Sequence, residues 1–246
     1  MKTTSKTGAL YGLGLGPGDP ELVTVKSVRL IETLPVIAYF AKAGRRGHAR
    51  AIVDRWLPAS ARELPLYYPV TTELPVGEPA YNARLAAFYE ASSETIAKHL
   101  LAGQDVAVLS EGDPLFYGSF MHLYVRLKDR FPTTIVPGVA GMSGCWSAAG
   151  EPITWGDDVL TVLPGTLGEA ALTERLKATD AAVIMKIGRN FAKVRAALIA
   201  SDMVDRAIYV ERGSMRDERI MRLSEKSDDV APYFSMILVG GQGRRP

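Results

Sequence analysis

The sequence is poor in cysteine and histidine and has no long apolar run. Cys145 is the only cysteine, which excludes an internal disulfide, and the three histidines, His48, His99 and His122, are too scattered to have the spacing of zinc ligands. No stretch approaches the roughly 18 uninterrupted apolar residues of a membrane span. The polar residues 1–8 are not followed by the apolar run that is typical of a secretory signal peptide. We therefore expect a cytoplasmic protein with neither a metal centre nor a membrane span.

A large excess of charge of one sign is also lacking. Lysine and arginine number 29 against 27 aspartate and glutamate residues, for a net charge of +2. Nucleic-acid-binding domains usually have a strongly basic balance, so the overall charge does not indicate a nucleic-acid partner or a charged membrane surface. Binding of an anionic ligand would have to come from a local group of basic residues.

Short β-branched apolar runs, each leading into an amphipathic stretch, are the recurring feature that the sequence does have. Continuous apolar runs of this kind are typical of strands that are buried on both faces of a parallel sheet. Their alternation with helical patterns, including residues 21–34 and 79–102, predicts an α/β fold. The eight predicted strands lie within residues 9–16, 36–40, 106–112, 133–138, 159–165, 181–188, 206–213 and 235–241.

Three segments suggest how the predicted strands are organised. Residues 219–225 directly follow the strand that ends at Gly213 and predict a hairpin partner for it, so we expect a mixed C-terminal sheet. The proline-rich segment 62–79 predicts an extended loop or an irregular strand near the surface. A helical stretch over residues 115–130, closed by Phe131-Pro132, is the predicted hinge between two sheets and gives domains 1–125 and 126–246.

A glycine-rich loop, residues 12–18 (GLGLGPG), ends the first predicted strand and precedes a helix. Glycines in this position let backbone amides approach a ligand closely. A dinucleotide fingerprint needs glycines at offsets 0, 2 and 5, but the third position is Pro17 when counted from Gly12 and Asp19 when counted from Gly14. A nicotinamide-dependent oxidoreductase is therefore only an alternative, and glycines that merely form a tight turn are another.

Three separate motifs together resemble the signatures of one family. Residues 14–24 (GLGPGDPELVT), 110–118 (SEGDPLFYG) and 136–144 (VPGVAGMSG) are similar, in this order, to the signatures of the tetrapyrrole methylases, which use S-adenosylmethionine. The similarity continues through residues 185–188 and 211–214. This resemblance implies two α/β domains, an N-terminal one with a mostly parallel sheet and a C-terminal one with a mixed sheet, with the cofactor in the cleft between them. It also implies a homodimer.

Within the family, residues 111–120 (EGDPLFYGSF) and 141–146 (GMSGCW) are most similar to members that methylate C20 of precorrin-2 on the route to cobalamin. Uroporphyrinogen methylases would show Gly-Gly-Asp-Pro and then Phe-Gly-Arg, whereas this chain has Glu111 and Ser119 at the differing positions. The resemblance thus implies methyl transfer to C20, which gives precorrin-3A. Methylation of a cobalt-containing substrate or of another tetrapyrrole carbon is the alternative.

The family pattern also assigns the residues around S-adenosylmethionine, which would leave as S-adenosylhomocysteine. Asp113, which precedes Pro114, could equally cap the following helix, and Cys145 is more consistent with packing than with chemistry. No residue is identified as a general base. The implied cofactor contacts are Pro17, Glu111, Gly112, Asp113, Phe116, Ala140 and Gly141, with Met185, Lys186 and Gly213 at the adenine end.

A basic segment, residues 42–50, follows the second predicted strand. The implied substrate is a flat macrocycle with carboxylates around its edge, and guanidinium groups match carboxylates well. We therefore hypothesise that Arg45, Arg46 and Arg50 bind substrate carboxylates and that Tyr117 lies beside the macrocycle. A solvated basic surface loop is the alternative interpretation.

Overall fold

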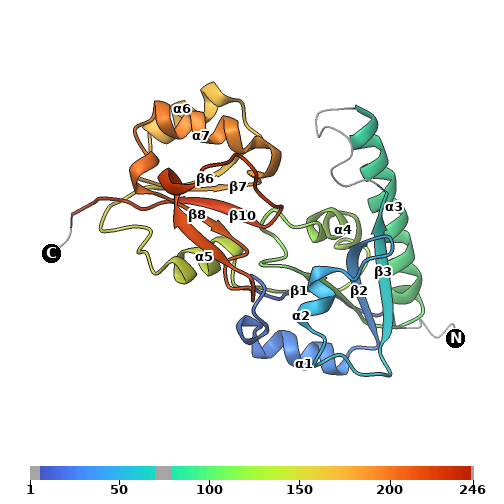
Figure 1. The fold of residues 1–246 in the computed structure, drawn as a ribbon. Coiled ribbons are helices and arrows are strands. Elements are labelled where there is room, and N and C mark those ends of the chain that lie inside the picture. The colour runs from blue at the N-terminus through green and yellow to red at the C-terminus, as the bar shows by residue number, and fades with distance from the viewer. Residues whose placement is uncertain (1–5, 70–78, 245–246) are drawn as a thin grey trace, which may run out of the picture. The chain divides into compact units, whose positions relative to one another are not determined.

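The computed structural model describes residues 6–69 and 79–244 and divides the chain into two compact units, residues 1–140 and 141–246 (Figure 1). The described residues of each unit form one five-stranded sheet with helices on both faces. The first sheet is entirely parallel and the second is mixed. The predicted fold class of two α/β domains, one mostly parallel and one mixed, is confirmed.

In the first unit the strand order is β3-β2-β4-β1-β5. Helices α1 and α2 contribute to the apolar core on one face of this sheet, and α3 and α4 to the core on the other. The strands are β1 (Leu10–Gly14), β2 (Val36–Lys42), β3 (Arg62–Tyr68), β4 (Val106–Ser110) and β5 (Thr133–Val136), and the helices are α1 (Val25–Thr33), α2 (His48–Ile52), α3 (Pro79–Leu101) and α4 (Phe120–Leu127).

In the second unit the strand order is β6-β7-β10-β8-β9, and only the β6–β7 pair is parallel. Helices α6 and α7 cover one face and α5 packs on the other. The strands are β6 (Leu160–Pro164), β7 (Ala181–Met185), β8 (Ala207–Glu211), β9 (Arg219–Arg222) and β10 (Ser235–Val239), and the helices are α5 (Gly141–Ala149), α6 (Glu169–Lys177) and α7 (Phe191–Ala200). Short 3₁₀ turns are η1 (Pro20–Leu22), η2 (Gly188–Asn190), η3 (Val204–Arg206) and η4 (Leu223–Glu225).

Seven of the eight predicted apolar runs contain a strand and the eighth, residues 36–40, lies within β2, while β9 pairs antiparallel with β8 as the predicted hairpin partner. The division between the units comes later in the chain than predicted. The predicted boundary at residues 125/126 falls inside α4, and β5, which follows α4, pairs with β1 in the first sheet. The chain therefore returns to the first sheet after the stretch that was predicted to be a hinge.

Two local predictions also change. The predicted helix 21–34 is divided, because the Thr24 hydroxyl accepts a hydrogen bond from the Ser27 amide at 3.2 Å and begins α1 there. Val25, the first residue of α1, is 85% exposed. Residues 62–68 of the proline-rich segment form the edge strand β3, which tolerates Pro65, whereas residues 70–78 lie outside the described part. No described helix is long and apolar enough to cross a membrane.

Candidate active site

Three turns meet at the carboxyl edge of the first sheet, where parallel strands all end on the same side. We call residues 14–19, 111–116 and 138–140 the three-turn cluster. Gly16 and Gly112 join the first two turns by a reciprocal pair of backbone hydrogen bonds. The Gly112 amide donates to the Gly16 carbonyl at 2.7 Å, and the Gly16 amide donates to the Gly112 carbonyl at 3.3 Å.

The third turn packs directly on the other two through glycines. A Cβ atom added to Gly138 would lie 2.1 Å from the Gly112 carbonyl oxygen, and one added to Gly14 would lie 2.4 Å from the Gly138 amide nitrogen. Real Cβ atoms essentially never come within 3.0 Å of such atoms. Gly14 and Gly138 therefore allow the turns to pack closely against one another.

Asp113 links the second and third turns. One carboxylate oxygen accepts a hydrogen bond from the Leu115 amide at 2.9 Å, which closes a short turn after Pro114. The next helix, α4, begins only at Phe120, so Asp113 does not have the helix-capping role that was the alternative for it. The other oxygen accepts from the Gly138 amide at 3.2 Å. Asp113 is half-buried, so its negative charge is held at the junction of the turns.

The first turn is fixed to the helix that follows it. The buried Ser27 hydroxyl donates a hydrogen bond to the Gly14 carbonyl at 3.0 Å, and Asp19 caps the short turn η1 by accepting from the Glu21 amide at 2.8 Å. Pro17 lies buried within this turn. Sequence reasoning missed Ser27, although the Thr24-x-x-Ser27 spacing after the loop is a helix-start signal that could have drawn attention to it.

Another residue that sequence reasoning missed is Ser110, the last residue of β4. Its hydroxyl is buried and has no hydrogen-bond partner among the described residues. Ser110 pairs in register with Gly14, so it lies directly before the second turn and next to the first. Ser110 is the first residue of the motif 110–118, but the motif assigns no role to its hydroxyl.

Aromatic side chains follow the second turn at the surface. Phe116 is half-buried and Tyr117 is 42% exposed, and their rings meet edge-on with centroids 5.0 Å apart. Tyr117 has a φ of 54°, in the left-handed region that costs a non-glycine residue free energy. Leu115 beside them is also exposed. This edge of the sheet therefore presents apolar surface next to the three-turn cluster.

The arginines of the basic segment 42–50 differ in their surroundings. Arg50 is only 7% exposed, and its Nε and Nη2 donate to the two carboxylate oxygens of Glu63 at 2.6 and 3.0 Å. Its Nη1 donates to Asp54 at 2.9 Å, and Arg46 also pairs with Asp54. Arg45 is exposed. Arg50 is therefore engaged by acidic partners of its own chain, and this favours a structural role over the predicted contact with substrate.

The ion pairs of Arg50 change the acidity of their partners. The Arg50 guanidinium, hydrogen-bonded to Glu63, holds the pKa of that carboxyl below its usual range. Tyr39 donates a hydrogen bond to the same carboxylate at 2.9 Å, and burial together with this negative neighbour raises the pKa of Tyr39 to about 12. All three groups therefore keep one charge state at neutral pH.

Glu111 connects the second turn to helix α2. Its side chain is exposed, and one carboxylate oxygen accepts a hydrogen bond from the backbone amide of Ala49 at 3.0 Å. That amide belongs to the first turn of α2, where backbone donors have no partner inside the helix. The predicted cofactor residue thus already has a partner in the basic segment.

The second unit gathers the other predicted residues at one edge of its own sheet. Because β10 is antiparallel to both β7 and β8, the ends of β7 and β8 lie at the same edge. Met185 ends β7 and is followed by exposed Lys186, whose φ is 57°. Gly213 follows β8, and Gly141 begins α5.

Helix α5 connects Gly213 with Gly141. A Cβ atom added to Gly213 would lie 2.8 Å from Cys145 Sγ, and one added to Gly141 would lie 3.2 Å from Met236 Cε on β10. Cys145 is 5% exposed, and burial raises the pKa of its thiol to about 12. The thiol is therefore neutral and packed against Gly213, in agreement with the packing role predicted for it.

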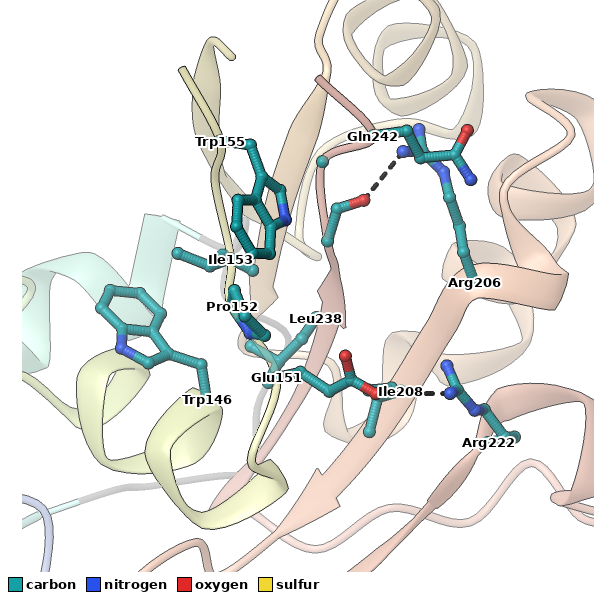
Figure 2. Close-up of a pocket in the computed structure, with 12 residues that line it drawn as sticks. Trp146, Glu151, Pro152, Ile153, Trp155, Arg206, Ile208, Arg222, Leu238 and Gln242 are labelled. Carbon is teal, nitrogen blue, oxygen red and sulfur yellow. Dashed lines mark hydrogen bonds and ion pairs between the residues drawn. The ribbon is translucent and has the colours of Figure 1, made fainter. Parts of the chain in front are cut away.

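A separate pocket in the second unit contains none of the predicted site residues (Figure 2). It is lined in part by the indole rings of Trp146 and Trp155. Its two arginines already have partners, since Arg222 pairs with Glu151 at 3.3 Å and Arg206 donates to the Gly240 carbonyl at 2.8 Å. The three-turn cluster therefore remains the stronger candidate for chemistry.

Comparison with known proteins agrees with the motifs. Residues 9–227 match the model of the family Tetrapyrrole (Corrin/Porphyrin) Methylases. The chain is 59% identical over 239 residues to a precorrin-2 C(20)-methyltransferase of a Sinorhizobium species, covering 97% of this chain and 98% of that protein. It is 29% identical to the cobalt-precorrin-2 C(20)-methyltransferase of Salmonella typhimurium, covering 96% and 97% of the two chains.

A solved structure extends the similarity to the fold. The uroporphyrin-III C-methyltransferase of Thermus thermophilus, solved in complex with S-adenosylhomocysteine, superposes with a TM-score of 0.67 at 23% identity and covers 95% of this chain and 97% of that one. The family match spans most of the sequence, and the same sequence carries three signature motifs whose turns the first unit brings together. The chain belongs to the tetrapyrrole (corrin/porphyrin) methylase family.

Proposed function

We propose that this protein transfers the methyl group of S-adenosylmethionine to C20 of precorrin-2, which gives precorrin-3A in cobalamin biosynthesis. The observation that carries the proposal is the 59% identity, over nearly the full length of both chains, to a precorrin-2 C(20)-methyltransferase. Identity to the relative named for the cobalt-containing substrate is 29%. This difference favours the metal-free tetrapyrrole as the substrate.

The three-turn cluster offers groups that suit a sulfonium nucleotide. The cofactor has a cationic sulfur, and the half-buried Asp113 supplies negative charge three residues before the aromatic Phe116. We propose Pro17, Gly112, Asp113, Phe116 and Ala140 as the cofactor contacts of the first unit; the Glu111 carboxylate, which the family pattern also assigns to the cofactor, is engaged instead by the Ala49 amide. The family pattern adds Gly141, Met185, Lys186 and Gly213 from the edge of the second sheet.

The chain's contribution to the reaction is positioning. The bound cofactor supplies an already activated methyl group, so catalysis depends on how the reactants are held. Hydrogen bonds and glycine contacts between the three turns fix the geometry of this edge. Apolar surface at Leu115 and Tyr117 suits the flat centre of the macrocycle, and Arg45 and Arg46 suit its peripheral carboxylates.

Incubation with isotope-labelled S-adenosylmethionine and precorrin-2 tests this function. We expect one labelled methyl group on the product, at C20 by carbon-position analysis, and slower turnover of cobalt-precorrin-2 assayed in parallel. Label at another carbon would contradict the assignment within the family. A preference for the cobalt complex would assign the protein to the other branch.

Charge reversal tests the substrate contacts separately. Arg45→Glu should raise the Michaelis constant for the tetrapyrrole by about tenfold, because loss of a charge-assisted hydrogen bond costs about 1.5 kcal/mol or more. Arg29→Glu, an exposed site on α1, is the matched control and should leave that constant unchanged. Equal constants for the two variants would remove Arg45 from the proposed substrate site.

We also propose that the protein works as a homodimer in the cytoplasm, as the resemblance to the family implies. Light scattering of the purified protein at micromolar concentration measures the assembly directly. A mass of one chain at the concentrations used in the activity assay would contradict the dimer.

A further inference from the structure

Helix α2 carries the end of the basic segment 42–50 and has only five residues, His48–Ile52. A helix of this length does not persist alone in water, because nucleation is costly and few hydrogen bonds repay it. Its position must therefore come from contacts with other elements. Those contacts lie at both of its ends and involve different parts of the first unit.

The carboxyl-terminal end of α2 is held by Arg50. The guanidinium binds both carboxylate oxygens of Glu63 on the edge strand β3 and also binds Asp54. Tyr39 on β2 also donates a hydrogen bond to Glu63, at the oxygen that Arg50 Nε binds. A bidentate pair of this kind fixes orientation as well as distance, so this end of the helix is tied to two strands.

The amino-terminal end of α2 is held by the second signature motif. Glu111 accepts the hydrogen bond of the Ala49 amide at 3.0 Å, and its negative charge is favourable beside the amino end of a helix. Gly47, which precedes the helix, is packed so closely that an added Cβ would lie 2.4 Å from the Phe40 carbonyl oxygen. The loop between β2 and α2, which includes Arg45, is thus fixed at both ends.

From these contacts we infer that Glu111 is a positioning residue for the substrate-binding loop, and that its carboxylate acts through α2 instead of contacting the cofactor directly. This inference rests on the proposed function and refines it, because it moves the Glu111 side chain from the cofactor side to the substrate side. It also explains why an acidic side chain stands at this place in the motif. A carboxylate reaches the free amide of α2, and a glycine there would leave that amide without this partner.

Two variants of Glu111 separate positioning from direct cofactor contact. Glu111→Ala removes the hydrogen bond and should raise the Michaelis constant for the tetrapyrrole about tenfold, the size expected for loss of one helix-capping hydrogen bond. The turnover number at saturating substrate and the dissociation constant of S-adenosylhomocysteine should change less than about twofold. Glu111→Gln keeps an oxygen acceptor and should restore the Michaelis constant. Weaker S-adenosylhomocysteine binding in both variants would overturn the inference.

A double variant tests whether Glu111 acts through the loop. If Glu111 matters because it positions Arg45, then Glu111→Ala should have little further effect on the Michaelis constant in an Arg45→Ala background. Independent, multiplying effects of the two substitutions would contradict the coupling.

Hydrogen exchange gives a readout that does not depend on any reaction. In the holoprotein with S-adenosylhomocysteine, amides of residues 48–52 should exchange at least tenfold faster in Glu111→Ala than in the unaltered protein and in Glu111→Gln. Amides of α4 serve as the internal control and should not change. Unchanged exchange over residues 48–52 would refute the role of Glu111, whereas failure of methyl transfer with this exchange result intact would refute only the proposed function.

Discussion

The two sheet edges that carry the predicted site residues are built by different means. In the first unit, three turns pack backbone against backbone, and glycines at positions 14 and 138 make that approach possible. In the second unit, the loops after β7 and β8 place residues with side chains in the left-handed region, at Lys186, Arg212 and Ser214. The first edge relies mainly on close backbone packing and has one such strained residue, Tyr117, just after the second turn, whereas the second edge has three.

This difference shows what each edge requires from its sequence. Left-handed backbone costs a non-glycine residue roughly 1–2 kcal/mol, and it persists only where surrounding contacts enforce it. Around Arg212 such contacts exist, because its side chain pairs with Glu211 at 2.8 Å and with Asp217 at 3.3 Å, and Gly213 next to it packs on Cys145. Strain of this kind is concentrated at functional sites, which favours a ligand-related role for the second edge.

The largest effect is expected from a side chain placed among the three turns. Gly138→Ala puts a Cβ 2.1 Å from the Gly112 carbonyl oxygen, and because both partners are backbone the turns must separate. We expect a loss of about 3 kcal/mol in the free energy of unfolding, the upper end for overpacking, and no measurable S-adenosylhomocysteine binding. Denaturant unfolding and calorimetry measure the two quantities.

Gly44→Ala is the matched control for the loss of a glycine. Gly44 has a φ of 73° and nothing lies within 4 Å of its added Cβ. The free energy of unfolding of this variant should fall by only about 1 kcal/mol, because the substitution adds backbone strain alone. The variant should bind S-adenosylhomocysteine normally. Similar losses in the two variants would show that contact between the turns is not what the first edge depends on.

A smaller effect, dependent on pH, is expected at the ion pair that supports the first edge. Arg50→Met should lower the free energy of unfolding by about 2 kcal/mol near neutral pH. This is less than the 3–5 kcal/mol for a fully buried pair, because the Glu63 side chain is 38% exposed. Arg50 lowers the folded-state pKa of Glu63 below its ordinary value of 4.5. The pair therefore stabilises the fold fully above about pH 4.5, and this contribution is lost as the pH falls through the lower folded pKa.

Unfolding free energies measured from pH 7 down to pH 3 check this sign. The difference in the free energy of unfolding between the unaltered protein and Arg50→Met should become smaller below pH 4.5. A difference that stays constant, or that widens on acidification, would mean that Arg50 contributes through packing of its aliphatic part instead of through Glu63.

The elements of the first edge were predictable because local pattern and tertiary structure agree there. Runs such as residues 106–109 are apolar throughout because parallel strands are buried on both faces, and the parallel arrangement places the carboxyl ends of the strands at one edge. The glycines at positions 14, 112 and 138 stand in recognisable motifs. The assignment of residues from all three motifs to one cofactor site implies that these turns lie close together, and the contacts between them agree with that implication.

The predictions that changed depend on partners distant in sequence. The sequence does not distinguish the three arginines of the basic segment, Arg45, Arg46 and Arg50. Only the folded chain places Glu63 of β3 beside Arg50, and the ion pair between them holds Arg50 in a buried position. Glu63 lies in the proline-rich segment for which a loop was one expectation. The position of the boundary between the units likewise depends on the pairing of β5 with β1, which no local pattern records.

The smallest effect, and the one that tests the second edge most directly, is the removal of strain at Lys186. Lys186→Gly relieves a φ of 57° and should raise the free energy of unfolding by about 0.5–1 kcal/mol, after allowance for the flexibility of glycine in the unfolded chain. Asp202→Gly is the matched variant, because Asp202 is exposed, has the same φ of 57° and follows α7, outside the predicted site. Aspartate tolerates this conformation better than lysine, so the gain in the free energy of unfolding should be smaller for Asp202→Gly.

If the stem of Lys186 packs on the adenine, Lys186→Gly should weaken S-adenosylhomocysteine binding several-fold while Asp202→Gly leaves it unchanged. Stabilisation without any loss of binding would mean that the strain at this edge serves the fold and not the cofactor.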